Sequence, residues 1–254
     1  MGRQNITPFF KKEIIQNTNT MKLNNYFDKI ICINLDRRSD RWKEIQVQFK
    51  KAGLSVQRFS AVDGNPRGYA HVKDDPTGER SINAIKNNSF GGVAGCIASH
   101  TDIWKMAKKN KWKNVLIIED DCDFVHELQQ QFTERINEVP QDWDLLYFGG
   151  VHETRGGKFN PRKLSKHVVT CERMITTTCY AIKDTSYDLA LDIVFEQHPW
   201  FHTAIDGYLA AYIQPKCKAF AFHPPLAWQR SSFSDIQGGP RDYSKMMKES
   251  NIKE

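Results

Sequence analysis

The run VLIIEDDCDF, residues 115–124, is the most informative stretch of this sequence. Four apolar residues, typical of a strand buried on both faces, lead directly into Glu119, Asp120 and Asp121. Asp123 follows two positions later. Carboxylates this close repel one another, and burying them costs free energy unless a cation compensates their charge. The run therefore predicts a buried strand that ends in a candidate metal site, with a capped, solvated acidic turn as the alternative. Carboxylate oxygens favour a hard divalent ion such as Mn²⁺ or Mg²⁺.

Apolar strand patterns alternate with amphipathic helix patterns along the chain. Strands are predicted at 29–35, 56–62, 114–121, 143–150 and 176–182. Helices are predicted at 39–52, 91–110, 128–139, 185–197 and 201–213. This alternation predicts an α/β fold, in which a mixed, mostly parallel sheet is flanked by helices.

Two polar clusters follow strands of this predicted sheet. Residues 34–38, which include Asn34 and Arg37, come after the first strand, and the acidic run 119–121 comes after the central one. Ligands of parallel α/β sheets bind outside the carboxyl ends of the strands. Both clusters are therefore expected at the ligand-binding edge of the sheet.

The composition is that of a globular protein. The 254 residues are 40% hydrophobic and 26% charged, which argues against wholesale disorder, and the net charge is +6. The positive excess mildly favours anionic partners, but a solvated basic surface accounts for it, and we predict no binding of nucleic acid. We predict one domain at 28–237, a polar N-terminal extension at 1–27 and a mobile, charged tail at 238–254.

The cysteines and the apolar runs bear on the location of the protein. None of the six cysteines forms a Cys-x-x-Cys pair, which argues against a zinc cluster and favours buried thiols in a reducing compartment. No apolar run approaches the ~20 residues that a membrane-spanning helix needs. The N-terminal residues lack the apolar core of a signal peptide. We therefore expect a cytoplasmic protein without an integral membrane segment, and peripheral membrane association stays open.

Four other side chains are candidates for chemistry, each with a structural alternative. His223 precedes Pro224, which favours an extended backbone, and it is either a structural histidine or a further metal ligand. His100 lies on an apolar helix face, and we expect a hydrogen-bonded core residue or a residue that supports the acceptor side of the site in preference to a ligand. Asp206 is a surface acid or a general base. Asp235 is a helix cap or a ligand contact.

Eight motifs occur in a fixed order: IICINLDRRSDRW, FSAVDG, GCIASHTDIW, VLIIEDDCDF, DLLYFGG, YAI, AIDGYL and HPPLAWQRSSFSDI. Through them the chain resembles glycosyltransferase family 25, which includes lipooligosaccharide and collagen hydroxylysine galactosyltransferases, over about residues 28–237. The resemblance implies a GT-A type nucleotide-sugar-binding fold, a UDP-sugar donor and a divalent ion, Mn²⁺ or Mg²⁺. It also implies inverting transfer of a hexose, galactose or glucose, to a hydroxyl on a glycan or on a collagen-like protein.

The same resemblance implies roles for the acidic residues. Asp121 corresponds to the direct metal ligand, while Asp120 and Glu119 face the ribose and the uracil of the donor. Because Asp121-Cys122-Asp123 also spells the Asp-x-Asp pattern of GT-A enzymes, Asp123 stays an alternative ligand. His223 matches the position of a late metal-ligating histidine.

The resemblance further implies residues for the donor and for proton transfer. Asn34, Arg37 and Asp63 fall in the blocks expected to hold the nucleoside. Asp206 corresponds to the candidate base, because inversion needs a group on the opposite face of the sugar that deprotonates the acceptor hydroxyl. The metal would stabilise the charge on the departing diphosphate.

Two other classes of protein fit the same acids. A metal-dependent phosphoryl-transfer enzyme or nuclease also gathers carboxylates around metal ions. A non-catalytic nucleotide- or glycan-binding module would hold the donor without turnover. Hydrolysis of UDP-sugars would argue against the first alternative, and donor binding without transfer to any acceptor would favour the second.

Overall fold

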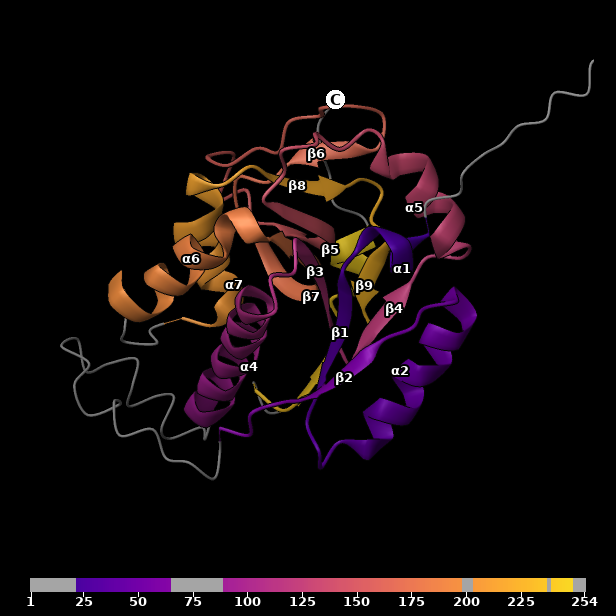
Figure 1. The fold of residues 1–254 in the computed structure, drawn as a ribbon, viewed down its shortest axis with the longest axis vertical. Helices are drawn as coiled ribbons and strands as arrows, with labels where there is room; N and C mark the ends of the chain where they lie inside the picture. The colour runs from indigo at the N-terminus through magenta and orange to yellow at the C-terminus, as the bar shows by residue number, and fades with distance from the viewer. Residues whose placement is uncertain (1–21, 65–88, 198–202, 237–238, 249–254) are drawn as a thin grey trace, which may run out of the picture.

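A seven-stranded sheet runs through the centre of the protein in the computed structural model, which describes residues 22–64, 89–197, 203–236 and 239–248 (Figure 1). The strands lie in the order β2-β1-β3-β7-β5-β8-β6. Their bounds are Lys29–Asn34 (β1), Gln57–Ser60 (β2), Asn114–Glu119 (β3), Leu145–His152 (β5), Val168–Thr170 (β6), Met174–Lys183 (β7) and Ala219–Phe222 (β8). All neighbours are parallel except at β7 and β6, which run against the strands beside them. The predicted mixed, mostly parallel sheet is confirmed.

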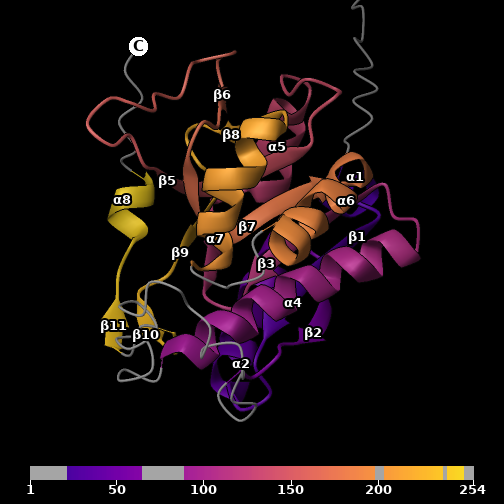
Figure 2. The ribbon, with the colours of Figure 1, turned by 90° about the vertical axis from the view of Figure 1, so that its left-hand side faces the viewer.

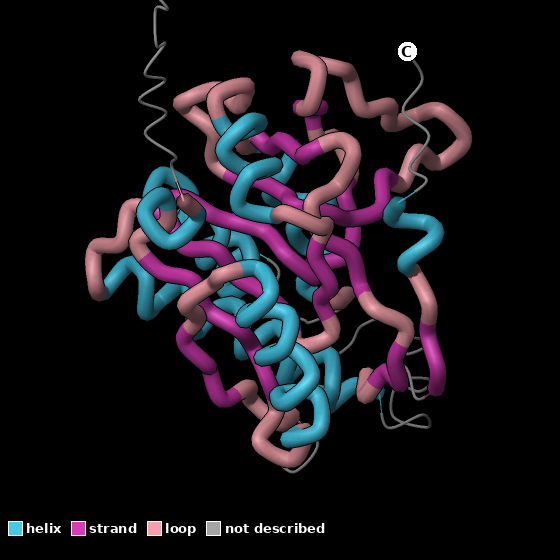
Figure 3. Tube along the Cα trace, turned by 90° about the vertical axis from the view of Figure 1, so that its right-hand side faces the viewer, coloured by secondary structure: helices cyan, strands magenta, loops and turns pink. Residues whose placement is uncertain are grey.

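Helices cover both faces of this sheet, as Figures 2 and 3 show. One face carries α1 (Leu23–Tyr26), α2 (Ser39–Ala52) and α5 (Leu128–Ile136). The other carries α4 (Ser89–Lys109), α6 (Asp184–Asp192) and α7 (Ile205–Tyr208). Three short helices continue α6 and α7: η3 (Ile193–Gln197), η4 (Leu209–Ile213) and η5 (Gln214–Lys216). The helix predicted at 201–213 is therefore present from Ile205, and residues 198–202 lie outside the described part.

The strand residues divide into two hydrophobic cores because their side chains alternate between the faces. Ile117 of β3 belongs to the core under α4 and α6, and its neighbour Ile118 belongs to the core under α2 and α5. All four apolar positions of β3 before Glu119 are buried. The central strand is therefore held from both sides, and its carboxyl end is a fixed position.

Two small antiparallel pairs of strands lie outside the central sheet as separate two-stranded sheets. The strand β4 (Cys122–Phe124) directly follows the acidic run and pairs with β9 (Ala227–Gln229). The strand β10 (Ser232–Ser234) pairs with β11 (Gly239–Arg241), and α8 (Ser244–Lys248) follows. Through these pairs the C-terminal part of the chain returns to the end of β3.

The folded part extends beyond the predicted domain bounds of 28 and 237. Leu23 and Phe27 are buried in the core under α1 and α5, within the region expected to be an extension. In the region expected to be a mobile tail, Met247 is fully buried, and its sulfur accepts a hydrogen bond from the backbone of Gln229. The segments that carry these side chains are short and mostly polar, so they were not predicted to pack against the core. No helix in the described ranges is long and apolar enough to cross a membrane.

A glycine allows the close crossing of β5 and β9. A Cβ atom at Gly149 would lie 1.8 Å from the carbonyl oxygen of Ala227, which is a backbone atom. The backbone N–H of Leu226 donates to the carbonyl oxygen of Phe148 at 2.7 Å, which fixes this approach. A side chain at position 149 would therefore push β9 away from the sheet.

We predict that Gly149→Ala lowers the midpoint of thermal unfolding, because overpacking of this kind typically costs about 1–3 kcal/mol. Gly150→Ala is a matched control. Its nearest new contact, at 2.6 Å, is the flexible side chain of Met174, and the nearest backbone atom, the carbonyl oxygen of Ile175, lies 2.9 Å away. Because this backbone contact is much less severe than the one at 1.8 Å, a smaller loss is expected. Thermal melts followed by circular dichroism measure both, and a Gly149→Ala variant as stable as the native protein would contradict the prediction.

Candidate functional site

A pocket opens at the carboxyl ends of β1 and β3, where both predicted polar clusters meet. The acidic run 119–121 lies on one side, and the first turns of α4 lie on the other. Its lining also includes Arg37, Arg41, Ala61–Gly64, Cys96, Ser99, His100, Gln229 and Ser234–Ile236. The side chains of this pocket thus come from segments spread over most of the described chain.

Asp120 is held by two side chains of the first motif. The amide of Asn34 donates to one carboxylate oxygen at 2.7 Å, and the guanidinium of Arg41 donates to the other at 2.8 Å. Arg58 in turn donates to the side-chain oxygen of Asn34 at 2.9 Å. Burial raises the pKa of Asp120, although Arg41 and Asn34 oppose that shift. Asn34 therefore acts as a support for Asp120.

Asp121 is buried and incompletely compensated. Its Oδ2 accepts a hydrogen bond from the side chain of Gln229 at 3.1 Å and lies 3.4 Å from a nitrogen of Arg41. Its Oδ1 is buried without a hydrogen-bond partner. Burial, together with the charge of Glu119, raises the pKa of Asp121 to about 7. The site thus contains a buried carboxylate oxygen that lacks a hydrogen-bond partner.

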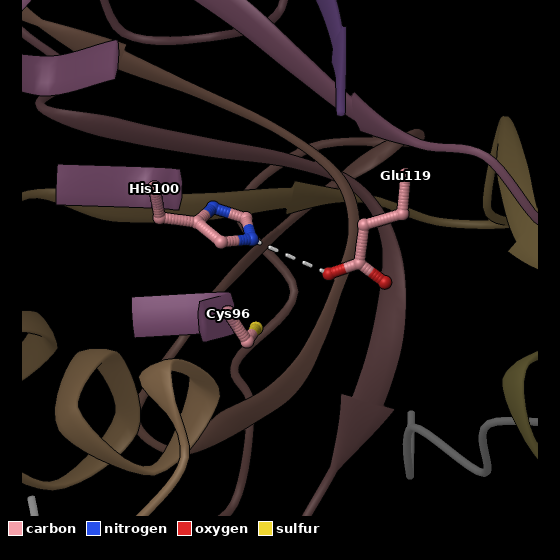
Figure 4. Close-up of side chains that lie close together, drawn as sticks. All are labelled: Cys96, His100 and Glu119. Carbon is pink, nitrogen blue, oxygen red and sulfur yellow. Dashed lines mark ion pairs between the residues drawn. The ribbon is translucent and has the colours of Figure 1, made fainter. Parts of the chain in front are cut away.

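Glu119 faces α4 instead of the aspartates. Its Oε1 accepts a hydrogen bond from the hydroxyl of Thr177 at 2.6 Å and lies 3.5 Å from Nε2 of His100. Burial disfavours its charge, but the interactions with His100 and Thr177 outweigh burial and lower its pKa. Cys96, one helical turn before His100, points toward the same carboxylate (Figure 4).

The ligand atoms of Cys96, His100 and Glu119 all lie within 4.8 Å of one another, so this group could hold a metal ion. His100 is buried, and its Nδ1 lies 3.0 Å from the hydroxyl of Tyr180. That hydroxyl also accepts a hydrogen bond from the indole N–H of Trp104 at 3.1 Å. His100 is thus a hydrogen-bonded core residue whose second nitrogen faces the pocket.

Ion pairs close the rim of the pocket. Arg37 donates to Asp63 at 3.0 Å and to Asp235 at 2.7 Å, and Arg38 also pairs with Asp235. Burial disfavours the charge of Asp235, but the two arginines outweigh burial and lower its pKa. Asp235 is therefore a contact of the pocket lining, and it links the C-terminal segment to the first motif.

Asp206 lies outside the pocket lining, at the start of α7. One of its oxygens accepts a hydrogen bond from the backbone N–H of Gly207 at 2.7 Å, and the other from that of Thr176 at 3.2 Å. Burial raises its pKa, and the two N–H groups oppose that shift. The charges of Glu119 and His100 also influence this pKa, so Asp206 lies near that side of the pocket.

The structure does not bring Asp123 into the pocket lining. Its carboxylate lies 3.3 Å from a guanidinium nitrogen of Arg230, which also pairs with Glu44 at 2.9 Å. Asp123 belongs to β4, where pairing with β9 directs the chain away from the end of β3. Between the two alternative metal ligands, the geometry favours Asp121.

The structure also separates His223 from the acidic run, contrary to the expectation of a further metal ligand. His223 follows β8, and β7 and β5 lie between β8 and β3. With strands about 4.8 Å apart, three intervals place the two strand ends about 14 Å apart. Burial and the nearby Lys163 and Arg135 lower the pKa of His223, so its surroundings are basic.

Several contacts of the site were not predicted from the sequence: Arg41, Cys96, Thr177, Gln229 and Ser232. Arg41 was recognisable in principle, since a buried acidic run needs a cation and DRRSDRW lies in the neighbouring motif. The other four carry no charge at neutral pH, and nothing in their local pattern distinguishes them from core or loop residues.

The chain is similar to proteins of one glycosyltransferase family. A family profile described as "Glycosyltransferase family 25 (LPS biosynthesis protein)" matches residues 27–206. Procollagen galactosyltransferase 2 of Mus musculus is 27% identical over 233 residues, covering 80% of this chain and 35% of the relative. A Glycosyltransferase 25 family member of Drosophila melanogaster is 31% identical over 134 residues, covering 48% of this chain and 21% of the relative. The chain thus spans about a third or less of the length of these relatives.

Among solved structures, a glycosyltransferase involved in glycosylation of the major capsid of PBCV-1 aligns with a TM-score of 0.41 at 10% identity. That alignment covers 74% of this chain and 77% of the other. The family profile spans well over half of the sequence, including the acidic run, the motif around His100 and Asp206. On this evidence the chain belongs to glycosyltransferase family 25.

Proposed function

We propose that this chain is a divalent-metal-dependent, inverting glycosyltransferase that moves a hexose from a UDP-sugar to a hydroxyl of a glycan or protein acceptor. The family supplies the reaction class. The observation that carries the proposal is the incompletely compensated carboxylate of Asp121 at the end of β3, whose buried Oδ1 has no hydrogen-bond partner, inside a pocket lined by the first family motif. The name of the murine relative supports galactose as the hexose and a collagen-like protein as the acceptor.

Asp121 fits a divalent ion with oxygen ligands. Its buried Oδ1 has no partner, and a cation there would offset the repulsion from Glu119 and Asp120. Gln229 and Ser232 hold the other oxygen from the side, so the carboxylate is already oriented. A bound Mn²⁺ or Mg²⁺ would supply Lewis-acid stabilisation of the negative charge on the departing diphosphate.

The rim of the pocket beside the first motif suits the nucleoside of the donor. Arg37 lies at the rim beside Asp63 and Asp235, where a guanidinium can bind an anionic group or a ribose hydroxyl. Asn34 acts indirectly, because its amide holds Asp120 in place. Asp120 and Glu119 line the pocket and offer carboxylate oxygens to hydroxyl and N–H groups of the donor.

Asp206 is our candidate for the catalytic base. Two backbone N–H groups fix both of its oxygens, which favours the ionised form, while burial raises the pKa and so the basicity. In the proposed step Asp206 accepts the proton of the acceptor hydroxyl as that oxygen bonds to the anomeric carbon and the diphosphate leaves. The acceptor would then bind on the α7 side of the pocket.

A screen of UDP-galactose and UDP-glucose tests the function directly. We expect Mn²⁺-dependent release of UDP that chelation abolishes, and sugar transfer to a glycan or to a hydroxylysine-containing peptide. Cleavage of other phosphate esters with no release from UDP-sugars would instead indicate a phosphoryl-transfer enzyme. Donor binding with no release and no transfer would indicate a binding module.

Asp121→Asn should abolish Mn²⁺ binding in isothermal titration calorimetry and stabilise the metal-free protein. The pKa of Asp121 in the folded protein, about 7, exceeds the ordinary value of 3.8. The protonated carboxyl group of the native protein therefore favours folding at low pH. This contribution to stability is lost as the pH rises from about 4 to 7, where the buried group must ionise. The gain in melting temperature of the variant should therefore be larger at pH 8 than at pH 5.

Asp123→Asn is the matched control for this experiment, because that carboxylate pairs with Arg230 outside the pocket lining. We expect it to keep its affinity for Mn²⁺. The native protein should bind Mn²⁺ less tightly below pH 7, where a proton competes for Asp121. If Asp123→Asn loses the metal and Asp121→Asn retains it, the assignment of the ligand is reversed.

Asp206→Asn should lower the rate of transfer ~10²–10⁴-fold, which is the typical loss for a positioned base. Binding of UDP with Mn²⁺ should stay nearly unchanged, since Asp206 lies outside the pocket lining. Asp188→Asn, a change at an exposed acid of α6, serves as the control and should transfer normally. Thermal melts check the fold, because asparagine keeps only one of the two backbone contacts. Near-normal transfer by Asp206→Asn would rule it out as the base.

A further inference from the structure

We propose that Cys96, His100 and Glu119 form a second metal site in the pocket, suited to Zn²⁺ and separate from the proposed ligand Asp121. The three residues line the same pocket, and their ligand atoms lie within 4.8 Å of one another. Figure 4 shows the thiol and the imidazole directed from α4 toward the carboxylate at the end of β3. This inference goes beyond the proposed transferase activity, which needs only an oxygen-ligated ion.

The spacing of the ligand atoms is close to that of a bound ion. Nε2 of His100 lies 3.5 Å from Oε1 of Glu119. A tetrahedral zinc ion with nitrogen and oxygen ligands at about 2.0–2.1 Å separates such a pair by about 3.3 Å. Cys96 and His100 are four residues apart on α4, so they lie one helical turn apart on the same face. Small side-chain rotations would therefore complete the coordination.

Hydrogen bonds already orient two of these ligands from behind. Nδ1 of His100 is engaged by the hydroxyl of Tyr180, which Trp104 also contacts, so Nε2 is the nitrogen left for a metal. Thr177 donates to Glu119 and fixes the carboxylate. Partners of this kind orient metal ligands and strengthen metal binding. The network accounts for the buried His100 and the hydroxyl of Tyr180, which no step of the proposed transfer uses.

The ligand chemistry distinguishes this site from the one at Asp121. A thiolate and an imidazole select a softer ion such as Zn²⁺, whereas Mn²⁺ and Mg²⁺ prefer carboxylate oxygens. The absence of a Cys-x-x-Cys pair argued against a zinc cluster, and this site needs only one thiol. On binding, the thiol of Cys96 releases its proton to solvent as the zinc–sulfur bond forms. Three protein ligands leave a fourth position open toward the pocket.

Titration of the full chain with Zn²⁺ and with Co²⁺ tests the site. We expect one Zn²⁺ ion to bind to the native protein, and Co²⁺ to produce a thiolate-to-cobalt charge-transfer band in the near ultraviolet. Cys96→Ser should weaken Zn²⁺ binding at least about tenfold and remove the band, since it replaces the sulfur ligand. His100→Gln is a second variant that should also weaken binding, and melting curves confirm that each variant folds.

Two controls separate this proposal from the proposed function. Cys217→Ser changes another half-buried free cysteine that lies outside the pocket lining, and it should bind Zn²⁺ as the native protein does. Asp121→Asn should lose Mn²⁺ but keep Zn²⁺ and the cobalt band. The proposal is overturned if Cys96→Ser binds Zn²⁺ with native affinity, or if Asp121→Asn abolishes Zn²⁺ binding. Neither result would affect the test of sugar transfer.

Discussion

Three consecutive carboxylates at the end of a buried strand are the constraint on which this structure depends. The strand β3 is covered on both faces, so the chain cannot turn the acidic run away into solvent. Different elements satisfy the three residues: α2 supplies Arg41 to Asp120, β7 supplies Thr177 to Glu119, and β9 supplies Gln229 to Asp121. Compensation of charge at one strand end therefore joins elements that are remote in the sequence.

The negative charges of the three carboxylates are compensated unequally, and the three residues therefore suit different chemical roles in the pocket. Arg41 neutralises Asp120, and His100 with Thr177 favours the charge of Glu119. Asp121 receives little of this support, and burial together with the charge of Glu119 raises its pKa to about 7. The three similar side chains thus differ in their surroundings. Asp120 is a fixed hydrogen-bond acceptor, Glu119 lies beside a histidine and a thiol, and Asp121 has a free oxygen that a cation could bind.

The fold was predictable from the sequence because its signals are local. Continuous apolar runs such as 29–35 and 115–118 indicated buried strands, and the spacing of residues on α4 indicated a helix. The position of His223 was not predictable, because it depends on the order of strands in the sheet, which no local pattern states. Gln229 and Thr177 were missed for a related reason, since each becomes part of the site only through pairing with a distant strand.

The ion pair between Arg37 and Asp235 joins residues that are 198 positions apart. A chain leaves the ribosome from its N-terminus at about 5–20 residues per second, so Arg37 emerges at least several seconds before its partner. During that interval the guanidinium and the acidic run of β3 are both made, but the rim that encloses the pocket is not. The growing chain therefore acquires its enclosed pocket only after the segment around Asp235 has been made and reaches the first motif.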